Sequence, residues 1–163
     1  MWPEPVRRVA DFLRTAHAEA RIEEFPDGTP TAEDAARAVG APPSQIVKSL
    51  VFDCDGRPVL ALVPGDRRAD SAKIARAAGA GRARVATREE VVAATGFEPG
   101  AVAPFPHKGI DLVVVDRSLL THERVWIGAG SPKHLACVGP HELLRLTKGR
   151  EMDAVADDEY HST

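Results

Sequence analysis

The chain has 163 residues, a length that suits one domain with a full hydrophobic core rather than two domains. Its 44% apolar and 28% charged residues are ordinary for a globular protein, and no apolar run is long enough to span a membrane. The start, Met1-Trp2-Pro3-Glu4, lacks the basic and apolar segments of a signal peptide. These features exclude membrane-spanning and secreted classes, and a cytoplasmic location is the default expectation.

The net charge of −3 is unevenly distributed along the chain. Residues 151–163 contain five acids and no Lys or Arg, so the first 150 residues carry a net charge of +2. We expect residues 1–150 to form a single domain and residues 151–163 to be a disordered acidic tail. Residues 67–88 hold seven Lys or Arg, with Asp70 as their one acid. This basic cluster is either a solvated helix surface or a footprint for an anion or a nucleic acid.

The two cysteines, Cys54 and Cys137, each lie in or beside an apolar run that is typical of a strand. Neither belongs to a Cys-x-x-Cys motif or has a pair of histidines nearby, so ordinary thiols are favoured over a zinc site. We expect neither a metal nor a cofactor.

The first half of the chain predicts two helices and a hairpin. Apolar residues at helical spacing indicate a helix over residues 5–20, followed by an extended segment at 21–25. Thr31 is a typical N-cap of a second helix, with Asp34 at the capping-box position and Gly40 at its end. Residues 46–53 and 58–63 read as strands joined by the turn sequence Asp55-Gly56.

The second half alternates helices and strands. Asp70 caps a helix that Gly79 ends, and Thr87 with Glu90 forms a capping box for a helix that ends before Gly96. Residues 97–108 are predicted to be a loop, and residues 110–115, 124–129 and 134–138 to be strands. Pro140 begins a last helix, which runs to residue 146. The order of these elements predicts an α+β (mixed α/β) fold, with a mixed β-sheet curled into an open barrel and flanking helices.

Two features carry the chemistry. Lys48 lies inside an apolar strand, so its ammonium must reach solvent or face a site that prefers a cation. Far downstream, a strand ends in the small-residue loop Gly128-Ala129-Gly130-Ser131-Pro132, whose backbone amides could receive a carbonyl or phosphate oxygen. An edge-strand surface lysine and a simple turn are the alternative interpretations.

Several segments, in order and spacing, resemble the YbaK/ProX family, the free-standing relatives of the insertion domain of bacterial prolyl-tRNA synthetases. The resemblance covers most of residues 5–148 and rests on residues 31–40, 45–50, 63–66, 95–100 and 128–132. It implies a barrel-like domain that hydrolyses the ester of mischarged aminoacyl-tRNA in trans, with the vicinal hydroxyl of the tRNA's terminal ribose helping to activate water. Mischarged aminoacyl-tRNA is then the partner, an aminoacyl-tRNA synthetase is a further candidate, and a monomer is the default.

The resemblance also implies site residues. The expected catalytic group comprises Lys48 and the loop residues Gly128, Ala129 and Gly130. The expected substrate-binding group comprises Phe25, Thr31, Ser131, Pro132 and His134, where His134 corresponds to a histidine of the prolyl-synthetase branch. The basic cluster supplies the expected tRNA-binding group, Arg67, Arg68, Arg82 and Arg84.

Two other functions remain open from the sequence. A non-catalytic module that binds tRNA or an aminoacyl-adenylate would retain its ligand but leave the ester intact. A phosphatase of the haloacid dehalogenase type is suggested by Asp53-Cys54-Asp55-Gly56, since in such enzymes the first aspartate attacks phosphorus. The strand that begins at once after Arg57 favours a hairpin turn over this phosphatase motif.

Overall fold

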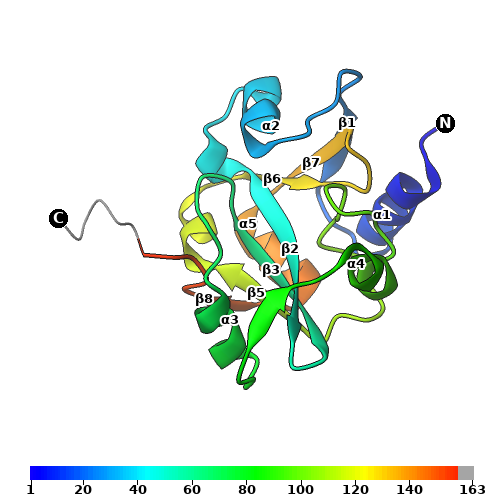
Figure 1. Cartoon of the computed structure of the whole chain (residues 1–163). Helices are drawn as coiled ribbons and strands as arrows, with labels where there is room; N and C mark the ends of the chain where they lie inside the picture. The colour runs from blue at the N-terminus through cyan, green and yellow to red at the C-terminus, as the bar shows by residue number, and fades with distance from the viewer. Residues whose placement is uncertain (158–163) are drawn as a thin grey trace.

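The structure is a computed structural model that describes residues 1–157 (Figure 1). The helices are α1 (Glu4–Thr15), α2 (Ala32–Val39), α3 (Ser71–Ala77), α4 (Arg88–Thr95) and α5 (Pro140–Thr147), with the short 3-10 turns η1 (Pro43–Gln45) and η2 (Arg117–Thr121). The strands are β1 (Arg21–Glu24), β2 (Val47–Cys54), β3 (Arg57–Pro64), β4 (Ala83–Val85), β5 (Leu112–Asp116), β6 (Val125–Gly128), β7 (His134–Val138) and β8 (Arg150–Met152). Within residues 1–157, no helix has the length and apolar character needed to cross a membrane.

The strands form two sheets. One is antiparallel, in the order β1-β7-β6, and the other is mixed, in the order β4-β2-β3-β5-β8. A single parallel bridge between Ile46 and Trp126 links them. The prediction of a mixed α+β fold is confirmed, whereas the open barrel is wrong, because neither sheet closes on itself within the described part of the chain. The three-residue strand β4 pairs only with residues 52–54 of β2, which leaves the first half of that strand's edge uncovered.

The hairpin of β2 and β3 forms where its turn sequence predicts. Asp55 and Gly56 both have positive φ, 52° and 89°, as a tight two-residue turn requires. The Asp53 carboxylate accepts a hydrogen bond from the Gly56 N–H at 2.6 Å, which closes the turn. The resulting register sets Lys48 opposite Val63.

The helix caps agree with the sequence, but the first helix is shorter than predicted. Thr31, Asp70 and Thr87 each accept hydrogen bonds from N–H groups of the first turn that follows them. Helix α1 ends at Thr15 rather than residue 20, and His17 takes a left-handed conformation with φ 54°. The chain must reverse there so that β1 can lie beside β7.

Four elements were not predicted: η1, β4, η2 and β8. The expectation of a disordered tail from residue 151 is corrected for residues 151–157, whereas residues 158–163 lie outside the described part of the chain. Strand β8 pairs in parallel with β5, and Ala154 and Val155 are buried at 0% and 5% exposure. The free energy gained by burying these two apolar side chains therefore favours order in this segment, although its composition is acidic.

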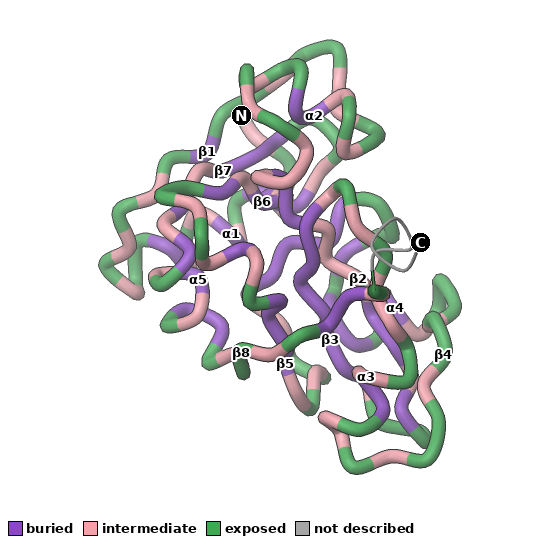
Figure 2. The backbone as a smooth tube through the Cα atoms, turned by 90° about the vertical axis from the view of Figure 1, so that its left-hand side faces the viewer, coloured by how far each residue is buried: buried purple, intermediate pink, exposed green. Residues whose placement is uncertain are grey.

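Figure 2 shows that buried backbone follows β7, β6, β2 and β3 through the middle of the molecule. The largest apolar cluster packs α1 and α5 against both sheets, and a second lies beneath α3. A small third cluster, which includes Ala35, Ala36, Ile46 and Leu135, joins α2 to the place where the two sheets meet. This junction positions the site described next.

Candidate functional site

A cleft of about 320 Å³ opens along the uncovered edge of β2. One wall is Ile46 with residues 47–50 of that strand, and another is residues 29–32 with Ala35 of α2. The remaining lining residues are Gly100, Val102, Gly128 and Leu135. The cleft therefore brings together Lys48, Thr31 and Gly128 from segments that are far apart in the sequence.

Lys48 is half-buried in this cleft. Its ammonium donates a hydrogen bond to the Arg67 carbonyl oxygen at 2.6 Å. Burial lowers the pKa of Lys48, and the carboxylates of Asp66 and Glu33 oppose that shift in part. Since an ammonium has three N–H donors, two remain for a bound anion or carbonyl oxygen.

Three hydroxyl groups line the cleft beside Lys48. Thr31 Oγ1 serves the cap of α2, accepting from the Asp34 N–H at 3.0 Å, and Thr29 Oγ1 donates to the Pro132 carbonyl at 3.3 Å. Ser49 Oγ is buried and has no hydrogen-bond partner among the described residues. A buried hydroxyl without a partner is costly, and since Ser49 directly follows Lys48 in β2 its side chain points to the other face of the strand.

The loop of residues 128–132 packs closely against its neighbours, and not all of its backbone N–H groups are free to bind a ligand. Gly128 lines the cleft, and a Cβ there would lie 3.1 Å from the Val102 carbonyl oxygen. The Ala129 N–H already donates to the His134 carbonyl at 3.0 Å. Gly130 has φ 102°, and a Cβ on it would lie 2.8 Å from the Pro5 carbonyl oxygen. Ala129 is therefore held to β7 and Gly130 lies against the start of α1, and of this loop only Gly128 lines the cleft.

His134 and Ser131 lie beyond the cleft wall. Ser131 Oγ is 2.6 Å from His134 Nδ1, and the imidazole packs edge-on against Trp2 with ring centroids 5.3 Å apart. Leu135, the next residue of β7, lines the cleft, and successive side chains of a strand point to opposite faces. The structure thus places His134 on the face of the sheet away from Lys48.

Phe25 and Pro132 lie at the rim rather than in the lining. Phe25 is half-buried and packs against the third cluster, and its N–H donates to the Lys133 carbonyl at 2.7 Å. The Thr29 N–H donates to the Pro132 carbonyl at 2.9 Å. These two hydrogen bonds hold the turn of residues 25–29 against the loop of residues 128–132. Phe25 and Pro132 therefore shape the cleft through their backbone.

The four arginines expected to bind tRNA lie in two places. Arg67 and Arg68 follow β3, next to Lys48, whereas Arg82 and Arg84 lie in or beside β4, which covers the far half of β2. Arg84 pairs with Asp53 at 2.5 Å and with Glu90 at 2.8 Å. The basic stretch of sequence is therefore not one continuous basic face.

The phosphatase motif is a structural turn. Asp53, its would-be nucleophile, accepts hydrogen bonds from the Gly56 N–H and from Arg84. It lies five residues from Lys48 along β2, about 17 Å away at the usual rise per strand residue. Within residues 1–157, no group of three or more His, Cys, Asp or Glu side chains is gathered closely enough to hold a metal ion.

Comparison with known proteins identifies the family. The sequence model of the aminoacyl-tRNA editing domain matches residues 27–146, which span the cleft from the turn before α2 to the end of α5. The chain belongs to the aminoacyl-tRNA editing domain family. The resemblance drawn from the sequence is thereby confirmed.

Relatives of this editing domain occur both within and outside synthetases. Proline–tRNA ligase of Nitratidesulfovibrio vulgaris is 34% identical over 145 residues, covering 88% of this chain and 24% of the ligase. The chain therefore spans about a quarter of the length of the ligases it matches. The uncharacterized protein YwhH of Bacillus subtilis is 34% identical over 130 residues, covering 79% of this chain and 82% of YwhH.

A solved structure agrees with the fold. The crystal structure of a candidate trans-editing enzyme for prolyl tRNA synthetase has a TM-score of 0.87 and 38% identity. It is matched over 96% of this chain and 100% of its own.

Sequence reasoning missed two features of the site, Ser49 and the contact of Lys48 with Arg67. Ser49 breaks the apolar run of β2 immediately after Lys48, and that polar pair could have marked the uncovered strand edge. The carbonyl of Arg67 carries no sequence signal, because any residue supplies one.

Proposed function

We propose that this editing domain hydrolyses the ester bond of mischarged aminoacyl-tRNA, acting in trans as an aminoacyl-tRNA deacylase. The observation that carries the proposal is the half-buried Lys48 ammonium in a cleft of about 320 Å³ that has both apolar and polar lining residues. Membership of the editing family supports the substrate class. Near full-length similarity to a candidate trans-editing enzyme and to YwhH supports action as a separate protein.

The proposed chemistry needs no nucleophilic side chain. An aminoacyl ester is already activated, so holding it against an attacking water and stabilising the negative charge on its carbonyl oxygen supplies the rate enhancement. Lys48 directs its free N–H donors at that oxygen or at the adjacent phosphate. Gly128 permits close approach of the substrate to the backbone.

The test is deacylation of a panel of mischarged tRNAs by the purified protein, with no synthetase added. Lys48→Ala should reduce kcat/KM by about thirty- to a thousand-fold, because a charged contact of this kind contributes roughly 2–4 kcal/mol to transition-state binding. Lys48→Arg should rescue poorly, since a planar fork does not replace a compact ammonium. Lys108→Ala, at an exposed lysine, is the matched control and should match the wild type.

The outcomes separate the candidate functions. Ester loss that requires Lys48 supports the deacylase. Retention of tRNA with the ester intact across the whole panel would instead identify a non-catalytic binding module. Equal turnover by Lys48→Ala and the wild type would remove Lys48 from the catalytic group.

A further inference from the structure

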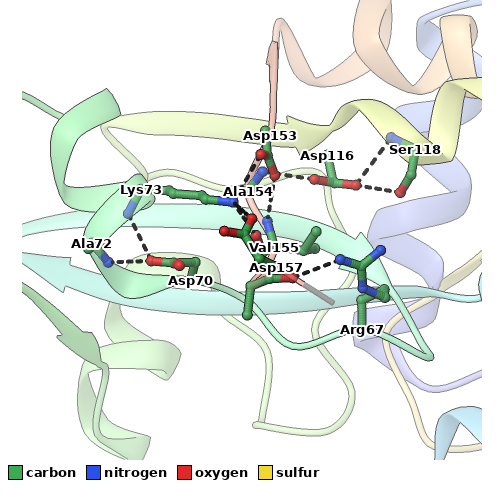
Figure 3. A network of polar contacts seen from close by, with 11 residues as sticks. Arg67, Asp70, Ala72, Lys73, Asp116, Ser118, Asp153, Ala154, Val155 and Asp157 are labelled. Carbon is green, nitrogen blue, oxygen red and sulfur yellow. Dashed lines mark hydrogen bonds and ion pairs between the residues drawn. The ribbon is translucent and has the colours of Figure 1, made fainter. Parts of the chain in front are cut away.

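The C-terminal end of the described chain is bound across the molecule rather than trailing from it. We call residues 150–157 the strap. The Ala154 N–H donates to the Asp116 carboxylate at 2.8 Å, and Asp116 is 1% exposed. Lys73 on α3 donates to the Val155 carbonyl at 2.6 Å and pairs with Asp153 and Asp157 at 2.9 and 3.0 Å (Figure 3).

The strap also pairs with the segment that follows β3. The Asp70 N–H donates to the Ala154 carbonyl at 2.9 Å, and the Ala156 N–H donates to the Arg68 carbonyl at 2.8 Å. An antiparallel bridge joins Ala69 and Val155 between these two bonds. Residues 68–70 are therefore held to the strap by main-chain pairing, and the strap is itself held to the buried Asp116 and to Lys73.

Arg67 connects this pairing to the cleft. Its guanidinium donates to the Ala156 carbonyl at 2.7 Å, and its own carbonyl accepts the hydrogen bond from Lys48 at 2.6 Å. The side chain of Arg67 thus binds the strap, and its main-chain carbonyl binds the Lys48 ammonium. Because the guanidinium anchors residue 67 to the strap, the Arg67 carbonyl has a fixed place, and that place determines where the Lys48 nitrogen lies and which of its donors remain free.

We propose that Arg67 is a positioning residue for Lys48: by anchoring on the strap, it holds the carbonyl that aims the Lys48 ammonium into the cleft. This inference rests on the proposed function of Lys48 and assigns to the C-terminal strap a part in that site. Arg67 acts through Lys48 and need not touch the reacting ester.

Epistasis with Lys48 tests the proposal. Arg67→Ala should lower kcat/KM for deacylation about tenfold in the wild-type background, because misplacing a charge-assisted contact forfeits much of its effect. In the Lys48→Ala background the same change should cost less than about twofold, because groups that act as a unit are not additive. Arg67→Lys should recover part of the activity, because an ammonium can still donate to the Ala156 carbonyl. Arg14→Ala, at an exposed arginine of α1, is the matched control.

An equal loss in both backgrounds would overturn the proposal, and so would full activity of Arg67→Ala. Such an equal loss would identify Arg67 as a separate tRNA contact or a general stabilising residue. Melting curves of all variants check that the fold is retained.

A second readout does not depend on catalysis. Competitive acetylation of lysines by acetic anhydride, followed by mass spectrometry, measures how well each amine is protected. Relative to the exposed Lys133, Lys48 should react several-fold faster in Arg67→Ala than in the wild type, because its hydrogen-bond partner is no longer fixed. If the wild type cleaves no mischarged tRNA but this increase occurs, the proposed function fails while the positioning stands. An unchanged Lys48 labelling rate would contradict the positioning whatever the activity.

Discussion

Lys48 and His134 are two buried basic side chains with different surroundings. Burial lowers the pKa of both. Lys48 opens onto the cleft and keeps donors for a ligand, whereas His134 is 2% exposed and packed between Trp2 and Ser131. The Nε2 atom of His134 has no hydrogen-bond partner among the described residues and lies 3.8 Å from the Glu24 carboxylate. We therefore propose that His134 contributes to the stability of the β1–β7 pair rather than to the reaction.

The pH dependence of stability should reveal this role of His134. Its folded pKa lies below the unfolded value of about 6.5, so the unfolded state binds more protons as the pH falls. The free energy of unfolding should be at its full value above that pH and should decrease as the pH falls from 7 to 5, by at most about 1.4 kcal/mol per pH unit. Urea unfolding at several pH values measures the slope.

His134→Gln is the comparison variant, because it removes the titration while leaving every other histidine in place. Its slope over this range should be smaller than that of the wild type, and its kcat/KM for deacylation should change less than about threefold. Parallel slopes would show that His134 does not titrate differently on folding. A large loss of activity would instead support the substrate-binding role that the sequence predicts for His134.

Among the elements, the strap shows how a polar segment becomes part of the core. Only Ala154 and Val155 of the strap are buried, and the carboxylates of Asp153 and Asp157 on either side of them both accept hydrogen bonds from Lys73. The hydrogen bond from Lys73 lowers the pKa of Asp153, and the same bond raises the pKa of Lys73. Both shifts indicate that the folded state favours the charged pair.

Removing Lys73 should therefore loosen the strap. In Lys73→Met, amide hydrogen exchange at Ala154 and Ala156 should be about ten- to a hundred-fold faster, because the variant loses hydrogen bonds whose net effect is roughly 1–3 kcal/mol. Exchange within β3, which is held by β2 and β5, should change far less. Lys108→Met, at an exposed lysine, controls for the loss of one charge. Unchanged exchange in Lys73→Met would show that the backbone pairing alone holds the strap.

Across the whole molecule, the basic residues are dispersed and partly neutralised. Lys73, Arg84 and Arg88 of the basic cluster all form ion pairs with acids, and Lys73 and Arg84 each contact two of them. Arg68 and Arg82 are exposed, the first next to the Lys48 strand end and the second near the β2–β3 turn. A tRNA that delivers its acceptor end to the cleft could meet Arg68 first and Arg82 farther along the acceptor stem.

The salt dependence of tRNA binding tests the role of Arg82. Arg82→Ala should weaken binding of whole tRNA and reduce the slope of log affinity against log salt by somewhat less than about one unit, as the loss of one phosphate contact predicts. It should leave cleavage of a short aminoacylated acceptor-end mimic unchanged. Filter binding at several salt concentrations measures the slope, and Arg14→Ala again serves as the control. An unaltered slope would show that Arg82 is only a solvated surface residue.

Local features of the fold were predictable from the sequence because the interactions that produce them span few residues. The caps at Thr31, Asp70 and Thr87 and the turn at Asp55-Gly56 rest on contacts no more than three residues apart. The Lys48 strand and the loop of residues 128–132 were recognisable for the same reason, together with the family resemblance. The sequence alone thus identified the family and most elements, and it singled out Lys48, which the structure places in the cleft.

Tertiary structure decided what depends on distant partners. Whether β4 would cover the whole edge of β2, and so remove the cleft, depends on pairing across about thirty residues of sequence, which no local pattern encodes. The face to which His134 points follows from the register of β7 with β1 and β6. The acidic strap was predicted to be disordered because its composition is polar, yet its two buried residues, its pairing with β5 and its bonds to Lys73 and Arg67 hold it in place. Burial and hydrogen bonding are supplied by the rest of the molecule, so composition could not reveal them.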